Sequence, residues 1–387
     1  MEKIKLAVLT PDYYPNFFAG IGVHVYSLIK NLSQMYDLDI TVFVVRCESL
    51  IDKTPHIYEN PNGVKVIEFT GVGDVPNDNL EYFTYKWTKN NILAIEYIST
   101  VIDDLQFDLI HCHDMFPIWV MDILRRKFKI PVVATIHARV APENEIGDSL
   151  RGFLCKTADV CVAVSNSLAQ LLIERYKIDN IKVIYNGISC RKIQELPQKE
   201  NYITFCGRIT KLKGVDILIK SFCRLTQNEE YKNLKLILIG EGRDKSVFEQ
   251  LVKELKLQDQ VVFKGKLENE VAREIISHSL LHIVPSLYEA FATVIEEAMM
   301  EKTCVIATRV GGAEEIIENG INGFLVEPNN VEELTEKMHF ILKNPIIKES
   351  VVENAYKTVQ HFQWSVISRQ VYNTYLEILD KVKKDVV

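Results

Sequence analysis

The sequence predicts an α/β protein made of two doubly wound parallel-sheet domains that face a central cleft. Apolar strands alternate with helical periodicities along the chain, which is typical of parallel sheets covered by helices on both faces. A polar, proline-containing segment near residues 188–200 separates two such series. The 387 residues also exceed the roughly 100–200 residues of one compact domain.

Each series contains six apolar strand candidates. In the first they are KLAVLT, ITVFVVR, VKVIEF, LIHCH, VVATIH and VCVAVS, with helices expected at residues 21–36 and 89–105. In the second, after residue 200, they are YITFCGR, KLILIG, VVFKG, LHIVPS, CVIATR and FLVE. The predicted domains are residues 1–190 and 191–363. We expect the last helix, about residues 364–387, to pack back onto the first domain.

Composition is ordinary for a globular protein, with 47% hydrophobic and 25% charged residues, and argues against disorder, collagen or a disulfide scaffold. No apolar stretch is long enough to cross a bilayer, and the N-terminus lacks the features of a signal peptide. The eight cysteines are scattered without a CxxC pair, so we expect reduced thiols and a cytoplasmic location.

Charge argues against nucleic-acid partners. Residues 1–190 hold 18 basic and 23 acidic residues, and the remainder holds 27 and 29, so neither half has a basic excess. The first helix candidate contains one lysine, whereas helices that bind membrane surfaces are usually rich in basic residues.

The segment PSLYEAFATVIEEAM, residues 285–299, contains the strongest functional pattern. The chain leaves a strand and enters a helix near Ala292, where free backbone N–H groups suit a diphosphate. Glu289 precedes that helix start and Glu297 lies about two turns inside, so both carboxylates are placed to accept hydrogen bonds from sugar hydroxyls. The alternative is an amphipathic helix with solvated glutamates.

Two further loops in the second half fit a nucleotide. In FCGRITKLKGVDIL, Arg208 and Lys213 follow a strand and are suited to clamp a diphosphate, the alternative being a solvated basic loop. In LILIGEGRD, Gly240 and Gly242 end a strand and let a nucleotide lie against the backbone, the alternative being a plain turn.

In the first half, Gly20 and Gly22 follow the first strand, but Val25 replaces the third glycine of a GxGxxG fingerprint, so we reject a dinucleotide site. HxHD at residues 111–114 invites a metal interpretation. No third ligand is obvious, and a structural or acceptor-side role is expected instead. His137 ends a strand, where a cleft residue or a capping histidine would sit.

These pieces, in this order, resemble the retaining glycosyltransferases of family 4, whose members have the GT-B fold of two Rossmann-like domains. The resemblance covers residues 6 to about 375. The matching stretches are AGIGVHVYSL, HCHD, TIHA, AVSNS, IYNGI, GRITKLKG, LIGEG, PSLYEAFATVIEEAM, ATRVGGAEEII and NGFLV. Ala19, Ser189 and Ala292 depart from the family's usual residues.

The resemblance implies a nucleotide-sugar donor, usually UDP-linked, in the second domain, with no cofactor and no metal. The donor-binding residues it implies are Gly20, Arg208, Lys213, Gly240, Gly242, Lys266, Leu267, Glu289, Ala292, Thr293 and Glu297. The catalytic residues it implies are Glu289, His137, Arg208 and Lys213.

The first domain is then expected to bind the acceptor, through His113, Asp114, Glu143 and Glu145. The acidic loop after His137 favours a neutral or cationic acceptor, although exposed carboxylates also serve solubility alone. We expect transfer of a hexosyl or N-acetylhexosaminyl group, with retention, to a small polyol, amino sugar or aminocyclitol of secondary metabolism. The alternatives are a glucan or lipid-linked glycan acceptor, a non-catalytic sugar-nucleotide-binding protein, and a nucleotide-sugar epimerase.

Overall fold

The computed structural model describes residues 3–15, 17, 20–46, 55–69, 80–115, 117–138, 145–190 and 198–385, the side chains of residues 80–87 and 385 excepted. The chain divides into two compact units. Unit 1 comprises Met1–Gly187 together with Trp364–Val387, and unit 2 comprises Ile188–Gln363. The division falls close to the boundary predicted after residue 190.

Unit 1 contains an eight-stranded sheet in the order β3-β4-β2-β1-β5-β6-β7-β8. The strands are β1 Ile4–Thr10, β2 Leu38–Val45, β3 His56–Glu59, β4 Lys65–Phe69, β5 Leu109–His113, β6 Val132–Ile136, β7 Val160–Ala163 and β8 Ile181–Val183. All neighbours are parallel except β3 and β4. The strand order reverses between β1 and β5, and such a reversal is where open α/β sheets bind ligands.

The helices of unit 1 are α1 Gly20–Met35, α2 Leu80–Val101, α3 Ile118–Phe128, α4 Glu145–Thr157, α5 Asn166–Tyr176 and α13 Trp364–Asp385. Helices α1 and α13 contact each other and share one apolar cluster with β1, β2, β4 and β5. In α1 the buried residues Val25, Leu28, Ile29 and Leu32 recur at helical spacing, which explains the face that it turns to the sheet.

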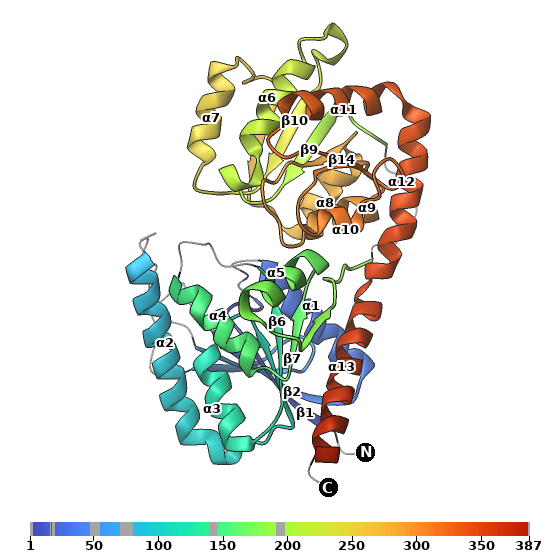
Figure 1. Ribbon diagram of the computed structural model, residues 1–387. Helices are drawn as coiled ribbons and strands as arrows, with labels where there is room; N and C mark the ends of the chain where they lie inside the picture. The colour runs from blue at the N-terminus through green and yellow to red at the C-terminus, as the bar shows by residue number, and fades with distance from the viewer. Residues whose placement is uncertain are drawn as a thin grey trace. The chain divides into compact units, whose positions relative to one another are not determined.

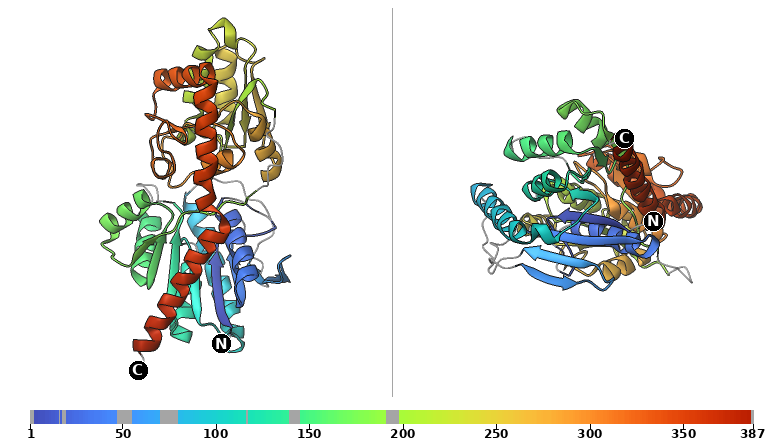
Figure 2. Two further views of the ribbon diagram at one scale, coloured as in Figure 1. Left: turned by 90° about the vertical axis from the view of Figure 1, so that its right-hand side faces the viewer. Right: turned by 90° about the horizontal axis from the view of Figure 1, so that it is seen from below.

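Helix α13 is joined to unit 1 by specific contacts as well as by apolar packing. The Tyr375 hydroxyl lies 2.6 Å from His111 Nδ1, and Tyr372 stacks on Tyr36 with ring centroids 3.8 Å apart. Figures 1 and 2 show α13 running alongside unit 1. None of the described helices combines the length and apolar character needed to cross a membrane.

Unit 2 contains a six-stranded parallel sheet in the order β11-β10-β9-β12-β13-β14. Its strands are β9 Tyr202–Cys206, β10 Lys235–Ile239, β11 Val261–Gly265, β12 His282–Val284, β13 Val305–Thr308 and β14 Phe324–Val326. Its helices are α6 Val215–Leu225, α7 Lys245–Glu254, α8 Asn269–His278, α9 Thr293–Met300, α10 Ala313–Ile316, α11 Val331–Lys343 and α12 Pro345–Val359. Here the strand order reverses between β9 and β12.

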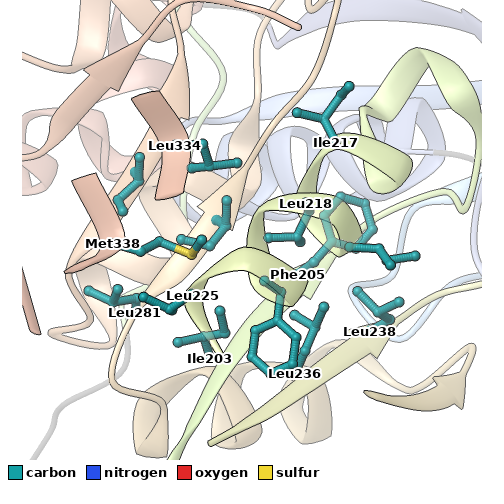
Figure 3. Packing of buried hydrophobic residues seen from close by; sticks show 14 of the residues in the cluster. Ile203, Phe205, Ile217, Leu218, Leu225, Leu236, Leu238, Leu281, Leu334 and Met338 are labelled. Atoms are coloured by element: carbon teal, nitrogen blue, oxygen red, sulfur yellow. The ribbon is translucent and has the colours of Figure 1, made fainter. Parts of the chain in front are cut away.

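One face of this sheet packs against α6, α7 and α11 (Figure 3). Alternate residues of the strands, such as Ile203 and Phe205 in β9, point to that face because side chains along a strand alternate in direction. Leu218 from α6 and Met338 from α11 complete the layer, and both are fully buried. This core fixes β9 and β12, whose carboxyl ends carry the predicted donor residues.

Candidate active site

Lys213 and Glu289 meet at the point where the strand order of unit 2 reverses. Lys213 follows β9 in the short 3₁₀ turn η2, Lys211–Lys213, and Glu289 lies in the loop after β12. The Lys213 ammonium forms an ion pair with Glu289 Oε2, and Ser286 Oγ donates to the same oxygen at 3.3 Å. The side chains are 19% and 15% exposed, so both remain open to solvent.

The loop that carries Glu289 is held from the β9 side. The Leu287 N–H donates to the Leu212 carbonyl at 2.8 Å. Gly214 has a φ of +65°, and a Cβ atom there would lie 1.9 Å from the Pro285 carbonyl oxygen. Only glycine fits this position, so the Lys-Gly pair at 213–214 lets the two loops touch.

A second glycine holds the same loop from the β13 side. Gly311 has a φ of +51°, and a Cβ atom there would lie 1.7 Å from the Glu289 carbonyl oxygen. Thr308 Oγ1, at the end of β13, donates to the Ser286 carbonyl at 2.5 Å. The sequence analysis did not predict that Gly311 and Thr308 position the Glu289 loop. The glycine pair that begins at Gly311 follows an apolar strand, and this was a signal for a close backbone approach.

Helix α9 begins just beyond this loop. Its N-cap residue, Ala292, makes no side-chain capping hydrogen bond, and Thr293 is exposed. The first N–H groups of the helix thus lack a side-chain acceptor from the cap, and the positive end of the helix dipole suits an anion.

Glu297 lies further along α9 and is half-buried. Its Oε1 accepts a hydrogen bond from Asn269 Nδ2 at 2.8 Å, which links it to the start of α8. Burial raises the pKa of the Glu297 carboxyl above its usual range, and Asn269 and Arg273 oppose that rise.

The loops after β9, β10 and β11 form a connected edge. A Cβ atom at Gly240 would lie 1.9 Å from the Gly207 carbonyl oxygen, and one at Gly242 would lie 2.3 Å from the Ile209 carbonyl oxygen. The Gly240 N–H donates to the Gly265 carbonyl at 2.8 Å. The space beside Gly240 and Gly242 is therefore filled by the chain's own backbone. Close packing of the loops is thus a structural reason for a glycine at each position.

In unit 1, His113 and His137 are directly linked. They lie at the ends of the adjacent strands β5 and β6, and His113 Nδ1 is 3.0 Å from His137 Nε2. Burial lowers the pKa of His137 to about 3, with His111 and Arg151 adding to the effect. The imidazole is therefore neutral at physiological pH.

The Asp114 carboxylate is bonded to another side chain of the protein. Its φ is +58°, it is 4% exposed, and its carboxylate accepts a hydrogen bond from Arg151 Nη2 at 2.9 Å. Arg151 is also 4% exposed, and its Nε and Nη1 atoms have no hydrogen-bond partner within the described part of the chain. Sequence reasoning missed Arg151, whose only signal was a lone arginine in the otherwise uncharged run SLRGFLC.

Comparison with known proteins identifies the family. Residues 18–192 match the family model described as Glycosyltransferase Family 4, and residues 189–358 match that described as Glycosyl transferases group 1. An uncharacterized glycosyltransferase of Methanocaldococcus jannaschii is 30% identical over 97% of this chain and 100% of its own. The chain is a family 4 glycosyltransferase with the GT-B fold.

Two further relatives of this glycosyltransferase have named activities. The N-acetyl-alpha-D-glucosaminyl L-malate synthase of Bacillus anthracis is 26% identical, over 77% of this chain and 82% of its own. A D-inositol 3-phosphate glycosyltransferase of Corynebacterium aurimucosum is also 26% identical, over 71% and 73%.

Two solved structures share the fold of the glycosyltransferase. The sucrose-phosphate synthase of Thermosynechococcus elongatus superposes with a TM-score of 0.82 at 21% identity, over 98% of this chain and 100% of its own. The Anabaena protein HepE, solved with UDP-glucose, gives 0.74 at 21% identity, over 97% and 100%.

The remaining predicted residues lie in unit 2, in unit 1 or outside the described part of the chain. Arg208 is exposed on the loop shared with Lys213, and Lys266 and Leu267 follow β11. Gly20 opens α1 with free space where a side chain would be, whereas Glu145 is the exposed first residue of α4. Glu143 and Ala19 lie outside the described residues.

The HxHD segment is divided between two roles. Both ring nitrogens of His111 are engaged, one by the Tyr375 hydroxyl and one by Thr135 Oγ1 at 2.7 Å. His111 thus has the structural role expected for part of this segment, and Asp114 supports Arg151. The acceptor-binding roles assigned to His113 and Glu145 stay predictions.

Proposed function

We propose that the protein transfers a hexosyl or N-acetylhexosaminyl group from a UDP-linked sugar to a hydroxyl of a small acceptor, with retention at the anomeric carbon. The Lys213–Glu289 pair beside the start of α9 carries the proposal. It puts a cation, a sugar-hydroxyl acceptor and an anion-binding helix end within two neighbouring loops. HepE, of the same fold, was solved with UDP-glucose, which supports a UDP-linked donor.

The donor is bound by complementary charge. An ammonium group has three donors, so Lys213 can bond Glu289 and a phosphate oxygen together, and Arg208 on the same loop supplies a second cation. Glu289 accepts hydrogen bonds from the sugar hydroxyls and Glu297 from the ribose. Lys266 and Leu267 meet the base. Two cations and a helix end then take the place that a metal holds at other diphosphate sites.

The reaction exchanges one C–O bond for another on the same face of the sugar. The anomeric carbon leaves the diphosphate oxygen as the acceptor oxygen approaches, and the departing diphosphate takes the acceptor proton. Arg208 and Lys213 stabilise the charge that develops on the diphosphate, which is where preorganised cations lower the barrier most. His137, neutral because it is buried, orients the sugar by hydrogen bonding without adding charge.

The acceptor is proposed to be a small polyhydroxylated molecule, such as a polyol, an amino sugar or an aminocyclitol. The names of two relatives point to small hydroxylated acceptors, malate and inositol 3-phosphate. Arg151 favours a second candidate, an acceptor that carries a carboxylate or phosphate, because its guanidinium is bonded by Asp114 through one nitrogen only. On the cysteine pattern, we place the reaction in the cytoplasm.

A donor-by-acceptor matrix read by nucleoside diphosphate release tests the proposal. The acceptor set holds one ring in three forms: neutral inositol, an inositol phosphate and an aminocyclitol. Turnover with the phosphate form selects the Arg151 candidate, and turnover with the other two selects the polyol or aminocyclitol. Turnover that persists in both Glu289→Ala and Lys213→Ala refutes the assignment. Donor binding without turnover across the panel favours a non-catalytic binding protein.

Metal independence of the donor site has its own measurement. UDP binding is titrated by calorimetry before and after treatment with a chelator. We expect the same dissociation constant in both, because the cations at the site are side chains. A loss of binding that added Mg²⁺ restores would show that the diphosphate is held by a metal.

A further inference from the structure

Helices α8 and α9 of unit 2 are joined by two hydrogen-bonded pairs of side chains. In the first pair, Asn269 Nδ2 donates to Glu297 Oε1 at 2.8 Å. In the second pair, Arg273 Nε donates to Glu301 Oε1 at 2.7 Å. The partners on each side are four positions apart, which is about one helical turn. The two pairs therefore lie one turn apart along the contact between α8 and α9.

The two pairs differ in charge and in burial. Arg273 and Glu301 are 7% and 1% exposed, so their opposite charges neutralise each other inside the protein. Asn269 is exposed and uncharged, so the half-buried Glu297 receives no countercharge from it. Among the described residues, Asn269 is the side chain that donates to the Glu297 carboxylate, and it bonds one oxygen only. Since an ionised carboxylate has about four acceptor positions, most of them remain for a ligand.

The Asn269 bond favours the ionised form of Glu297. Burial raises the pKa of the Glu297 carboxyl, and the hydrogen bond from Asn269 is the largest of the causes that lower it again. An ionised carboxylate only accepts hydrogen bonds, and a hydroxyl group bonds more strongly to a charged acceptor than to a neutral one. The bond thus prepares Glu297 to receive hydroxyl groups.

Asn269 also lies next to the residues assigned to the nucleotide base. It is the first residue of α8, and Lys266 and Leu267 precede it in the connection from β11. Glu297, which is assigned to the ribose, lies on α9. The Asn269–Glu297 bond therefore links the segment proposed to hold the base with the side chain proposed to hold the ribose.

We propose that Asn269 is a positioning residue, which holds the Glu297 carboxylate against the two ribose hydroxyls of the donor and so makes the site select nucleotides with an intact ribose. This role rests on the proposed function, in which Glu297 accepts hydrogen bonds from the ribose. A free glutamate side chain loses rotamer freedom when a ligand binds. A side chain already fixed by Asn269 avoids that loss, so the ribose is bound more tightly.

Nucleotide binding to the full-length protein measures this selectivity. UDP and 2′,3′-dideoxy-UDP share the base and the diphosphate and differ only in the two ribose hydroxyls. The wild-type protein is expected to bind UDP at least about tenfold more tightly by calorimetry, because a site built to bond hydroxyls rejects an analogue without them. In Asn269→Ala, UDP should bind about five- to tenfold more weakly, whereas binding of the dideoxy analogue should change by less than about twofold.

Further variants separate positioning from a merely structural role. Asn269→Asp keeps the shape of the side chain but removes its N–H donor and sets a like charge beside Glu297, so it should lose at least as much affinity as Asn269→Ala. In a Glu297→Ala background, Asn269→Ala should change UDP binding by less than about twofold, because its effect passes through Glu297. Asn201→Ala is the matched control and should bind both nucleotides as the wild type does, since Asn201 is an exposed asparagine of unit 2 that donates to the Asn233 carbonyl at 3.0 Å.

The outcomes separate the role of Asn269 from the proposed function. Selectivity for UDP that is absent from the wild type or retained in Asn269→Ala, or equal weakening of both nucleotides, overturns the role of Asn269 and leaves the donor site in place. A wild-type protein that binds neither nucleotide overturns the proposed function, and the role of Asn269 with it. Steady-state kinetics give a further readout. The KM for the donor should rise in Asn269→Ala with kcat nearly unchanged, because the ribose is held alike in the ground and transition states.

Discussion

Lys213 and Glu289 are 76 positions apart in the chain, yet they form one ion pair. Each alone is an ordinary charged residue, and only the neighbouring positions of β9 and β12 bring them together. Arg151 and Asp114 show the same principle in unit 1, where a buried guanidinium needs its carboxylate partner. At the scale of residues, the chemistry of the site depends on which charged side chains the fold brings into contact.

Lys213→Met is expected to lower the rate of nucleoside diphosphate release by about 10²–10³-fold, because it removes one donor to the developing charge. Lys220→Met is the matched control, since Lys220 is an exposed lysine of α6 paired with Asp216. Steady-state kinetics of both variants check the prediction. Equal losses in both would mean that the effect is not local to the donor site.

Glu296 should weaken the fold at neutral pH. It is fully buried in α9, neither of its oxygens has a partner within the described chain, and burial raises its pKa well above the usual 4.5. The folded state thus holds an extra proton, so the free energy of unfolding falls as pH rises from about 4.5 through the folded pKa. Glu296→Leu is expected to stabilise the protein by about 1–3 kcal/mol at pH 8 and by less at pH 5.

Urea unfolding at the two pH values measures this difference. Glu336→Leu, on the exposed side of α11, serves as the control and should change stability by less than about 0.5 kcal/mol at either pH. A gain that is the same at pH 5 and pH 8 would show that the Glu296 carboxyl is not the titrating group.

At the scale of elements, glycines let the loops at the carboxyl ends of the strands touch. Gly214 and Gly311 hold the Glu289 loop from two sides, and Gly240 rests on the loop after β9. The same loops carry Lys213 and Glu289. The close backbone contacts that these glycines allow therefore also place the two side chains of the site.

Gly311→Ala is expected to lower both stability and activity. The left-handed conformation costs a side chain about 1–2 kcal/mol, and the added methyl group also displaces the Glu289 backbone. Gly320→Ala is the matched control: its φ is +80°, but no atom lies within 4 Å of the new Cβ. Diphosphate release should fall in Gly311→Ala alone, and an equal fall in both variants would contradict the positioning role.

At the scale of the whole molecule, the two units have separate cores. The apolar cluster of unit 2 draws all its members from residues 203–351. The cluster of unit 1 needs two distant parts of the chain, since Trp364, Val371 and Tyr375 pack with β1 and α1. The chain thus completes unit 1 only after it has passed through unit 2.

Fragments of the chain check this difference. Residues 188–363 are expected to unfold cooperatively and to bind UDP, because their core is complete. Residues 1–187 should fold only when residues 364–387 are supplied, since the α13 face of the sheet is otherwise exposed. Circular dichroism during urea unfolding measures both. Cooperative unfolding of residues 1–187 alone would contradict the role given to α13.

Most strands could be predicted within a residue or two, because a strand buried on both faces is a continuous apolar run. Two strands of unit 1 were missed. β3 is mostly exposed and pairs antiparallel at the sheet edge, and β8 is only three residues long and half-buried. The helix expected at 89–105 begins earlier, at Leu80, and ends at Val101 with a 3₁₀ turn after it, Ile102–Asp104.

The sequence alone determined the parallel α/β architecture, the family and the pairing of basic loops with a helix start, because these depend on local apolar runs and short motifs. Only the tertiary structure decided that Gly311 packs against the Glu289 backbone and that Asp114 pairs with Arg151. It also decided that His24 lies beside His113 and His137. Such contacts join residues far apart in the chain. Their energies depend on distance and burial, which no local pattern of residues records.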